Sequence, residues 1–289
     1  MNSEPASASK TEPEKISGLG EVADRFDCFL IDQFGVLRDG RGAYPGAAEA
    51  LTRLKAAGKR VVILSNSGKR SAENSTRLAA FGFDEASWDR FLTSGETAWQ
   101  ILAEEEPTGD EGKRCLLISR DRDTSAIDGL KLTRVWTGDE ADVVIISASE
   151  GDHHSLSYYE RLLGPAARRG VPCLCTNPDK IMLTRSGETF GAGRIAELYQ
   201  ELGGTVRWIG KPFPDIYAAA SRFLGAPDPA RVACIGDSVE HDIAGAVRAG
   251  FASILVATGI LASASDEERR GLYREHEAVP DFIMPQFLW

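Results

Sequence analysis

The sequence predicts an α/β protein, a doubly wound parallel sheet with a smaller α/β module inserted into it. Short apolar, β-prone runs alternate with segments of helical period along almost the whole chain. Such alternation is typical of βαβ units and therefore of a parallel sheet. The chain has 289 residues, enough for two medium domains. A charged break at 104–114 and the pair Gly203-Gly204 lie close to the two ends of the insertion.

The first part of the core is predicted to span residues 18–100. Its strands are predicted from apolar runs at 26–32, 60–64 and 91–93. Its helices are predicted from apolar residues at helical spacing, near 45–58, at 72–81 and through Leu102. Residues 1–17 are polar, rich in Ser, Glu and Lys, and have no apolar stretch like that of a signal peptide. We expect them to form a disordered tail.

The inserted module is predicted to span residues 101–204, and the core to resume at 205–289. In the module, apolar runs predict strands at 115–119, 142–147 and 171–176, with helices near 155–169 and at 194–202. In the second part of the core, the same patterns predict strands at 205–209, 232–235 and 254–256, with helices near 214–224 and 241–249. Gly191 and Gly193 lie in a loose dinucleotide-like pattern that follows no strong strand, so we interpret them as a turn into a helix.

Composition excludes several classes of protein. The net charge of −10 argues against nucleic acid as a partner, because phosphate contacts require clustered Lys and Arg. No apolar run approaches the roughly 18 residues that span a bilayer, so no membrane segment is expected. The five cysteines are odd in number and lie mostly in apolar runs. This pattern is typical of reduced, buried thiols in a cytoplasmic protein.

Polar residues follow each predicted core strand at its carboxyl end. The residues are Asp32, the pair Ser65-Asn66, Lys211 after Gly210, and Asp237 with Asp242 five residues further on. Open α/β sheets bind ligands at this edge, so we expect the residues to form one site. Taken singly, each could equally be a turn, cap or surface residue. Their recurrence at four strand ends favours a functional site.

Phosphoryl transfer would use this set of residue types. A carboxylate such as Asp32 can attack phosphorus and form an aspartyl-phosphate. Two anions approach each other only if a cation neutralises them, and Mg²⁺ held by carboxylates is the usual cation. Lys211 can neutralise further charge, and the Ser65 hydroxyl can bind the phosphoryl oxygens. The set of residues therefore favours phosphoryl-transfer chemistry with Mg²⁺ at this site, and the resemblance described next implies an enzyme that acts on a small phosphorylated metabolite.

In order and spacing, the four motifs LIDQFGVL, VVILSNS, IGKP and CIGDSVEHD resemble those of the haloacid dehalogenase superfamily of aspartate-nucleophile phosphohydrolases. The long insertion, LTSGETA at 92–98 and TNPD at 176–179 are similar to the subgroup with a large α/β cap, subgroup IIA. That subgroup contains sugar-phosphate, para-nitrophenylphosphate and pyridoxal-phosphate phosphatases. The resemblance implies a Rossmann-like core with an inserted cap domain. Because members often dimerise through their caps, it leaves a homodimer open.

The resemblance also implies roles for individual residues. Asp32 would be the nucleophile and a metal ligand, with Asp237 and Asp242 as the other metal-site carboxylates. Ser65 and Lys211 would bind the transferring phosphoryl group. The substrate-binding residues implied by the resemblance are Asn66, Ser67, Gly68, Lys69, Asn177 and Asp179, the last two from the cap.

One residue departs from the family pattern. The second Asp of the family motif, which protonates the leaving group and activates water, is Phe34 here. Phe34 can still offer Mg²⁺ its backbone carbonyl, as that position does in the family. General acid–base catalysis contributes roughly 10²–10⁴-fold, so its loss should slow the enzyme without abolishing turnover. Asp39 and His241 lie near the motifs, but the sequence places neither as a substitute acid.

Three functions are compatible with this departure. The favoured one is a phosphatase with a substitute acid or a substrate with a good leaving group. The second is a phosphometabolite-binding or sensing protein with little or no turnover. The third is a metal-independent 2-haloacid dehalogenase, because such enzymes also have an aromatic residue two positions after the nucleophile. Gly236 and Asp237 argue against the third, since the metal-type fourth motif is retained.

Overall fold

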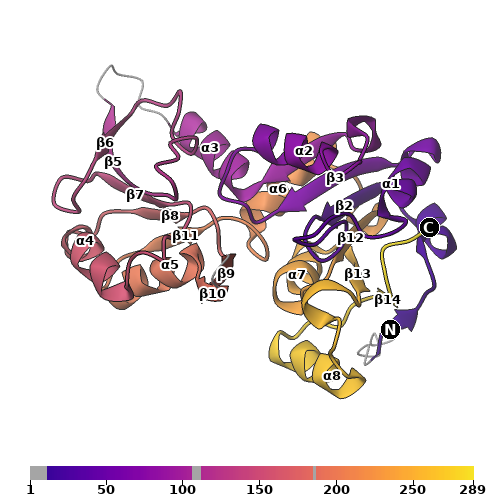
Figure 1. Cartoon of the computed structure of the whole chain (residues 1–289). Coiled ribbons are helices and arrows are strands. Elements are labelled where there is room, and N and C mark those ends of the chain that lie inside the picture. The colour runs from indigo at the N-terminus through magenta and orange to yellow at the C-terminus, as the bar shows by residue number, and fades with distance from the viewer. Residues whose placement is uncertain (1–11, 106–111, 185–186) are drawn as a thin grey trace, which may run out of the picture. The chain divides into compact units, whose positions relative to one another are not determined.

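The computed structural model describes residues 12–105, 112–184 and 187–289 (Figure 1). The chain divides into two compact units. The first unit comprises the described residues of Met1–Ile63, with Phe81–Asp89 and Leu224–Trp289. The second comprises Leu64–Ala80 and the described residues of Arg90–Phe223. Each unit is an α/β assembly of its own.

A seven-stranded sheet forms the core among the described residues. Its strands, in spatial order, are β1 (Glu14–Lys15), β14 (Phe282–Met284), β13 (Ala252–Val256), β12 (Val232–Gly236), β2 (Cys28–Asp32), β3 (Arg60–Ser65) and β4 (Arg90–Thr93). The pairings from β1 through to β2 are parallel. Residues of β12 and β3 are almost all buried, which explains why these strands appear in the sequence as continuous apolar runs. The predicted doubly wound parallel sheet is confirmed.

The helices of the first unit cover this sheet. α1 (Ala47–Ala56) buries one face made of Ala47, Ala50, Leu51 and Leu54, the residues whose spacing predicted it. A π-helical turn, η5 (Val239–Ile243), leads directly into α7 (Ala244–Ala249), and α8 (Asp266–Glu275) follows later. The short 3₁₀ helices of this unit are η1 (Leu19–Glu21), η2 (Ala23–Arg25), η3 (Glu85–Ser87), η4 (Pro229–Arg231) and η6 (Gly259–Leu261).

The second unit has a parallel sheet of five strands within its described residues. Their order is β11 (Val206–Trp208), β8 (Cys173–Cys175), β7 (Val143–Ile146), β5 (Lys113–Ile118) and β6 (Leu132–Val135). Helices α4 (Leu156–Arg168) and α5 (Ala192–Glu201) pack together against one face of it (Figure 1). On the other face, Ala98 and Ile101 of α3 (Ser94–Glu104) join an apolar cluster with Leu117 and Ile145.

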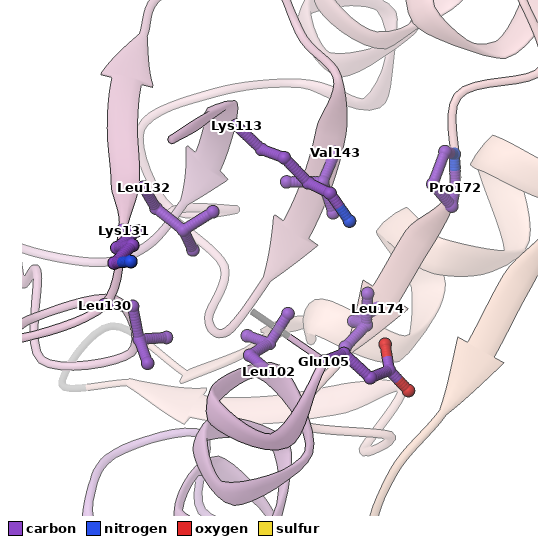
Figure 2. A pocket seen from close by; sticks show the side chains of 9 residues that line it. All are labelled: Leu102, Glu105, Lys113, Leu130, Lys131, Leu132, Val143, Pro172 and Leu174. Atoms are coloured by element: carbon purple, nitrogen blue, oxygen red, sulfur yellow. The ribbon is translucent and has the colours of Figure 1, made fainter. Parts of the chain in front are cut away.

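The remaining elements among the described residues of the second unit are two helices and a hairpin. They are α2 (Ser71–Ala79), α6 (Pro214–Phe223), and the antiparallel strands β9 (Ile181–Thr184) and β10 (Gly187–Phe190). A pocket of about 90 Å³ lies near the start of β5 and β6, where Lys113 and Lys131 adjoin apolar side chains (Figure 2). The pocket also adjoins Glu105, the last described residue before 106–111, and we assign it no function.

Two predictions about the ends of the modules need correction. The disordered tail expected at 1–17 is wrong for its last residues, because Glu14–Lys15 form β1 beside β14 and Ile16 is buried. Residues 1–11 of that tail lie outside the described residues. The strand expected in the core at 205–209 belongs instead to the second unit, since Val206–Trp208 pairs in parallel with β8. Apart from this strand, the division at 18–100, 101–204 and 205–289 stays a prediction.

Two predictions from composition can be compared with the structure. None of the helices within 12–105, 112–184 and 187–289 is long and apolar enough to cross a membrane. The five cysteines are buried free thiols, as predicted from their positions in apolar runs. Burial raises the pKa of the Cys115 thiol to about 12. That thiol is therefore protonated at neutral pH and is a poor nucleophile.

Candidate functional site

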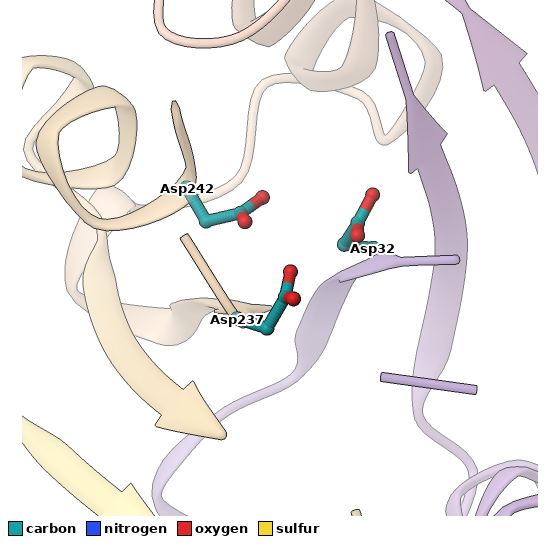
Figure 3. A group of neighbouring side chains, drawn as sticks. All are labelled: Asp32, Asp237 and Asp242. Atoms are coloured by element: carbon teal, nitrogen blue, oxygen red, sulfur yellow. The ribbon is translucent and has the colours of Figure 1, made fainter. Parts of the chain in front are cut away.

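Three carboxylates lie together in the first unit (Figure 3). Asp32 is the last residue of β2, Asp237 follows β12, and Asp242 lies on the π-helical turn. One oxygen from each lies within 4.8 Å of the others. They converge because β2 and β12 are parallel neighbours in the sheet, so both strands end at the same edge. The strand-end pattern in the sequence predicted this group.

Backbone amides fix two of these carboxylates. The amide of Ile260 donates to Asp237 Oδ2 at 2.9 Å, and the amide of Ser238 donates to Asp242 Oδ2 at 3.1 Å. Asp237 and Asp242 are 6% and 4% exposed. Three negative charges at this separation repel one another unless a cation lies among them. Carboxylate oxygens are the ligands that Mg²⁺ prefers, so the residues present fit that ion.

Close packing of two glycines brings a loop against the Asp237 carboxylate. Gly35 and Gly259 both have positive φ, at 78° and 60°. A Cβ built on Gly259 would overlap Asp237 Oδ2 and lie 2.6 Å from the Gly35 Cα. The Thr258 hydroxyl donates a hydrogen bond to the Gly35 carbonyl, which joins the two loops. This loop was not predicted from the sequence, although Thr258-Gly259 follows a predicted strand as the other site residues do.

We therefore expect Gly259→Ala to weaken Mg²⁺ binding by roughly 10–100-fold, the usual effect of disturbing a metal ligand's support. Gly58→Ala is the matched control, because Gly58 has a similar φ of 72° but nothing within 4 Å of an added Cβ. Titration of Mg²⁺ by calorimetry measures both variants. Equal affinities in the two variants would contradict the role given to Gly259.

Phe34 occupies the position of the missing family Asp, and its side chain is 52% exposed. The Arg38 guanidinium carbon lies 4.0 Å from the centre of its ring and 4.6 Å from that of Phe81. Arg38 also donates to the Asp39 carbonyl at 3.1 Å. The ring is therefore held by a cation–π contact, and it provides no proton donor.

Neither substitute acid considered from the sequence gains support. Asp39 accepts hydrogen bonds from the backbone amides of Arg41 and Gly42, which hold the pKa of Asp39 below its usual range. A carboxyl group with a lowered pKa is a poor proton donor. The His241 amide donates to the Ser238 hydroxyl at 3.1 Å, which caps the turn. This contact places the backbone of His241 and assigns no catalytic role to its ring.

A second group of predicted site residues lies in the second unit. The Asn66 side-chain oxygen accepts from the Lys211 backbone amide at 2.7 Å, and its amide nitrogen donates to the Lys211 carbonyl at 3.1 Å. The same nitrogen donates to Asp179 Oδ1 at 2.9 Å. Ser65, Asn66 and Lys211 are all less than 9% exposed. The sequence predicted the residues of this group, but not the hydrogen bond from Asn66 to Asp179.

The other predicted substrate-binding residues make local contacts. Ser67 Oγ accepts from the Lys69 amide at 3.3 Å, and the Ser67 carbonyl accepts from the Gly95 amide at 3.0 Å. Lys69 Nζ forms an ion pair with Glu73 at 3.0 Å. A Cβ on Gly68 would overlap the Ser147 carbonyl. Asn177 Oδ1 accepts from the Asp179 amide at 3.1 Å. Their roles toward substrate stay predictions.

Comparisons with known proteins agree with these motifs. Residues 29–133 match the family model described as haloacid dehalogenase-like hydrolase, and residues 208–287 match the model described as HAD-hydrolase-like. The haloacid dehalogenase-like hydrolase domain-containing protein 2 of Bos taurus is 31% identical over 244 residues. That alignment covers 83% of this chain and 87% of the bovine protein.

Two solved structures share the fold at 26% sequence identity. A hydrolase of the haloacid dehalogenase-like family from Brucella suis 1330 superposes with a TM-score of 0.80, covering 94% of this chain and 100% of that one. The p-nitrophenyl phosphatase from Archaeoglobus fulgidus superposes with a TM-score of 0.71, covering 90% and 96%. The similarity therefore extends over both units of the chain.

Proposed function

The chain belongs to the haloacid dehalogenase-like hydrolases, as a phosphatase of subgroup IIA, and on that premise we propose a Mg²⁺-dependent reaction through a phosphoryl group on Asp32. The observation that supports the proposal is the convergence of the Asp32, Asp237 and Asp242 carboxylates. The substrate is the phosphate monoester of a small metabolite. We take the 101–204 segment to be the cap domain of this enzyme.

In the proposed first step, a carboxylate oxygen of Asp32 attacks phosphorus. The bond from phosphorus to the ester oxygen breaks, and its electron pair leaves with that oxygen, which takes a proton from water. In the second step, water attacks phosphorus, the bond to Asp32 breaks, and inorganic phosphate and the free carboxylate form. When bound, Mg²⁺ neutralises charge between the carboxylates and the phosphoryl oxygens.

Ser65 and Lys211 are proposed to bind the phosphoryl oxygens. Ser65 ends β3, which is the neighbour of β2 in the sheet. Lys211 is 4% exposed, and its backbone is hydrogen-bonded on both sides to the Asn66 amide. A buried cation and a hydroxyl group stabilise the charge that develops on phosphoryl oxygens. The Phe34 carbonyl is proposed as a further metal ligand.

Because Phe34 cannot donate a proton, the reaction rate is expected to depend strongly on the leaving group. With no acid to protonate the ester oxygen, the rate follows how readily that oxygen leaves as an anion. We expect Mg²⁺-dependent phosphate release from para-nitrophenyl phosphate, slower release from alkyl phosphates by roughly 10²-fold or more, and loss of both in EDTA. Phosphate release measured across esters of graded leaving-group pKa tests this expectation. A flat dependence on leaving-group pKa would show that an acid acts in place of the missing Asp.

The same assay separates the alternative functions. Tight binding of phosphate esters with a long-lived phosphoryl group on Asp32 would favour a sensing protein, because Phe34 cannot activate the hydrolytic water. Halide release from a 2-haloacid in EDTA would favour a dehalogenase. The three converging carboxylates argue against that last reaction, since dehalogenases need no metal. Three further expectations stay predictions: a homodimer, a cytoplasmic location, and the lack of nucleic acid or membrane partners.

A further inference from the structure

The segment that carries Asp179 is packed closely against the start of α5. The Asp179 carbonyl accepts from the Gly193 amide at 3.0 Å, and the Lys180 carbonyl accepts from the Gly191 amide at 2.6 Å. A Cβ on Gly191 would overlap the Asp179 carbonyl, and one on Gly193 would overlap the Pro178 carbonyl. The glycine pair in the dinucleotide-like pattern therefore allows two backbones to touch, and it fixes the position of Asp179.

Asp179 and the Lys211 carbonyl, which accepts from the same Asn66 nitrogen at 3.1 Å, together fix the orientation of the Asn66 side chain. An asparagine amide can turn over, which exchanges its oxygen and its nitrogen. A carboxylate only accepts hydrogen bonds, so contact with Asp179 requires the nitrogen of Asn66 to point toward it. The Asn66 oxygen then faces the Lys211 amide, from which it accepts at 2.7 Å. The opposite orientation would set the Asn66 NH₂ group against that backbone N–H.

We propose that Asp179 is a positioning residue that holds Lys211 in place through Asn66. The proposal rests on the proposed function, in which Lys211 binds the phosphoryl group. Asn66 and Lys211 are 7% and 4% exposed, so water cannot readily replace a lost hydrogen bond between them. Asp179 is separated from Asn66 by 113 positions in the sequence. A residue of the segment inserted after the second motif, Asp179, thus helps to position Lys211 of the third motif.

The test compares four variants with the wild-type enzyme on para-nitrophenyl phosphate. Asp179→Ala is expected to lower kcat/KM by roughly 10²-fold, the effect of a small displacement of a positioning group. Asp179→Asn is expected to stay within about threefold of wild type, because its oxygen still accepts from Asn66. The double variant Asp179→Ala/Asn66→Ala should match Asn66→Ala alone, since Asp179 acts only through Asn66.

Glu197→Ala is the control. Glu197 lies on α5 and pairs with Lys180 at 2.8 Å, so this variant removes an ion pair from the same segment and leaves Asn66 untouched. We expect its kcat/KM to equal that of the wild type. Thermal unfolding of each variant shows whether a decrease in kcat/KM is caused by a less stable fold. If the wild-type enzyme is active and Asp179→Ala has the same kcat/KM, the inference is wrong. It is also wrong if the loss in the double variant equals the sum of the losses in Asp179→Ala and Asn66→Ala.

Binding of inorganic phosphate with Mg²⁺, measured by calorimetry on the same proteins, separates the two proposals. A wild-type enzyme that releases no phosphate from any ester would contradict the proposed function. Weaker phosphate binding in Asp179→Ala than in Asp179→Asn would still support the positioning role in that case. Equal phosphate affinity in wild type, Asp179→Ala and Asp179→Asn would contradict it.

Discussion

Replacing Asp32 with asparagine is expected to lower phosphate release by roughly 10⁴-fold or more, because a neutral amide cannot act as the nucleophile. Asn keeps the size of Asp, and Asp32 ends a strand whose preceding residues are buried, so we expect the fold to persist. Steady-state release from para-nitrophenyl phosphate at saturating Mg²⁺ measures the loss. An acid-quenched reaction analysed by mass spectrometry should show the phosphoryl group on the Asp32 peptide of the wild-type enzyme only.

The control is Asp24→Asn, which changes an exposed carboxylate in the same unit. It should leave phosphate release and Mg²⁺ affinity as they are in the wild type. Full activity in Asp32→Asn would exclude Asp32 as nucleophile. If high Mg²⁺ concentrations restore phosphate release in Asp32→Asn, Asp32 binds the metal and is not the nucleophile.

The carboxylate site could be predicted from the sequence because it depends only on which residues directly follow each strand. Asp32 and Asp237 each follow an apolar run, and parallel strands end at one edge of a sheet. Asp242 lies five residues after Asp237, and the π-helical turn between them returns its carboxylate to the same place. No knowledge of distant contacts was needed for these three residues.

The support around Asn66 could not be predicted in this way. Its partners Asp179 and Lys211 lie 113 and 145 positions away, and no spacing rule relates them. The resemblance placed Asp179 near the substrate, whereas the structure also shows it bound to Asn66. Hydrogen bonds between loops depend on how closely two loop backbones approach each other at glycines. This approach is visible in the structure and not in the sequence.

Several of the elements that were not predicted have weak apolar patterns. α8 buries only Tyr273, and the capping box of Ser265 and Glu268 at its start is the one clear signal of this helix in the sequence. The half-buried edge strand β6 and the exposed hairpin strand β9 have too little burial to give a clear pattern. β1 has two residues, and only its pairing with β14 identifies it.

Phe34→Asp is expected to raise the rate on alkyl phosphates, since it restores a carboxyl group at the position where the family has its acid. The Phe34 ring is half exposed, so its removal costs little core packing. Arg38 limits the gain, because its guanidinium lies 4.0 Å from the ring centre and would pair with the new carboxylate. That pairing would lower the carboxyl pKa and disfavour the protonated form that donates to the ester oxygen.

We therefore expect about a tenfold gain for Phe34→Asp and roughly 10²–10⁴-fold for Phe34→Asp/Arg38→Gln, both largest on esters with poor leaving groups. Rates across a leaving-group series measure the gain, and thermal unfolding reports the loss of the Arg38 contact with Phe81. Phe34→Ala is the control, because it opens the same space without adding an acid. An equal gain in Phe34→Ala would show that the ring only obstructs the substrate. A gain confined to the Asp variants would mean that the missing proton donor is what limits this enzyme.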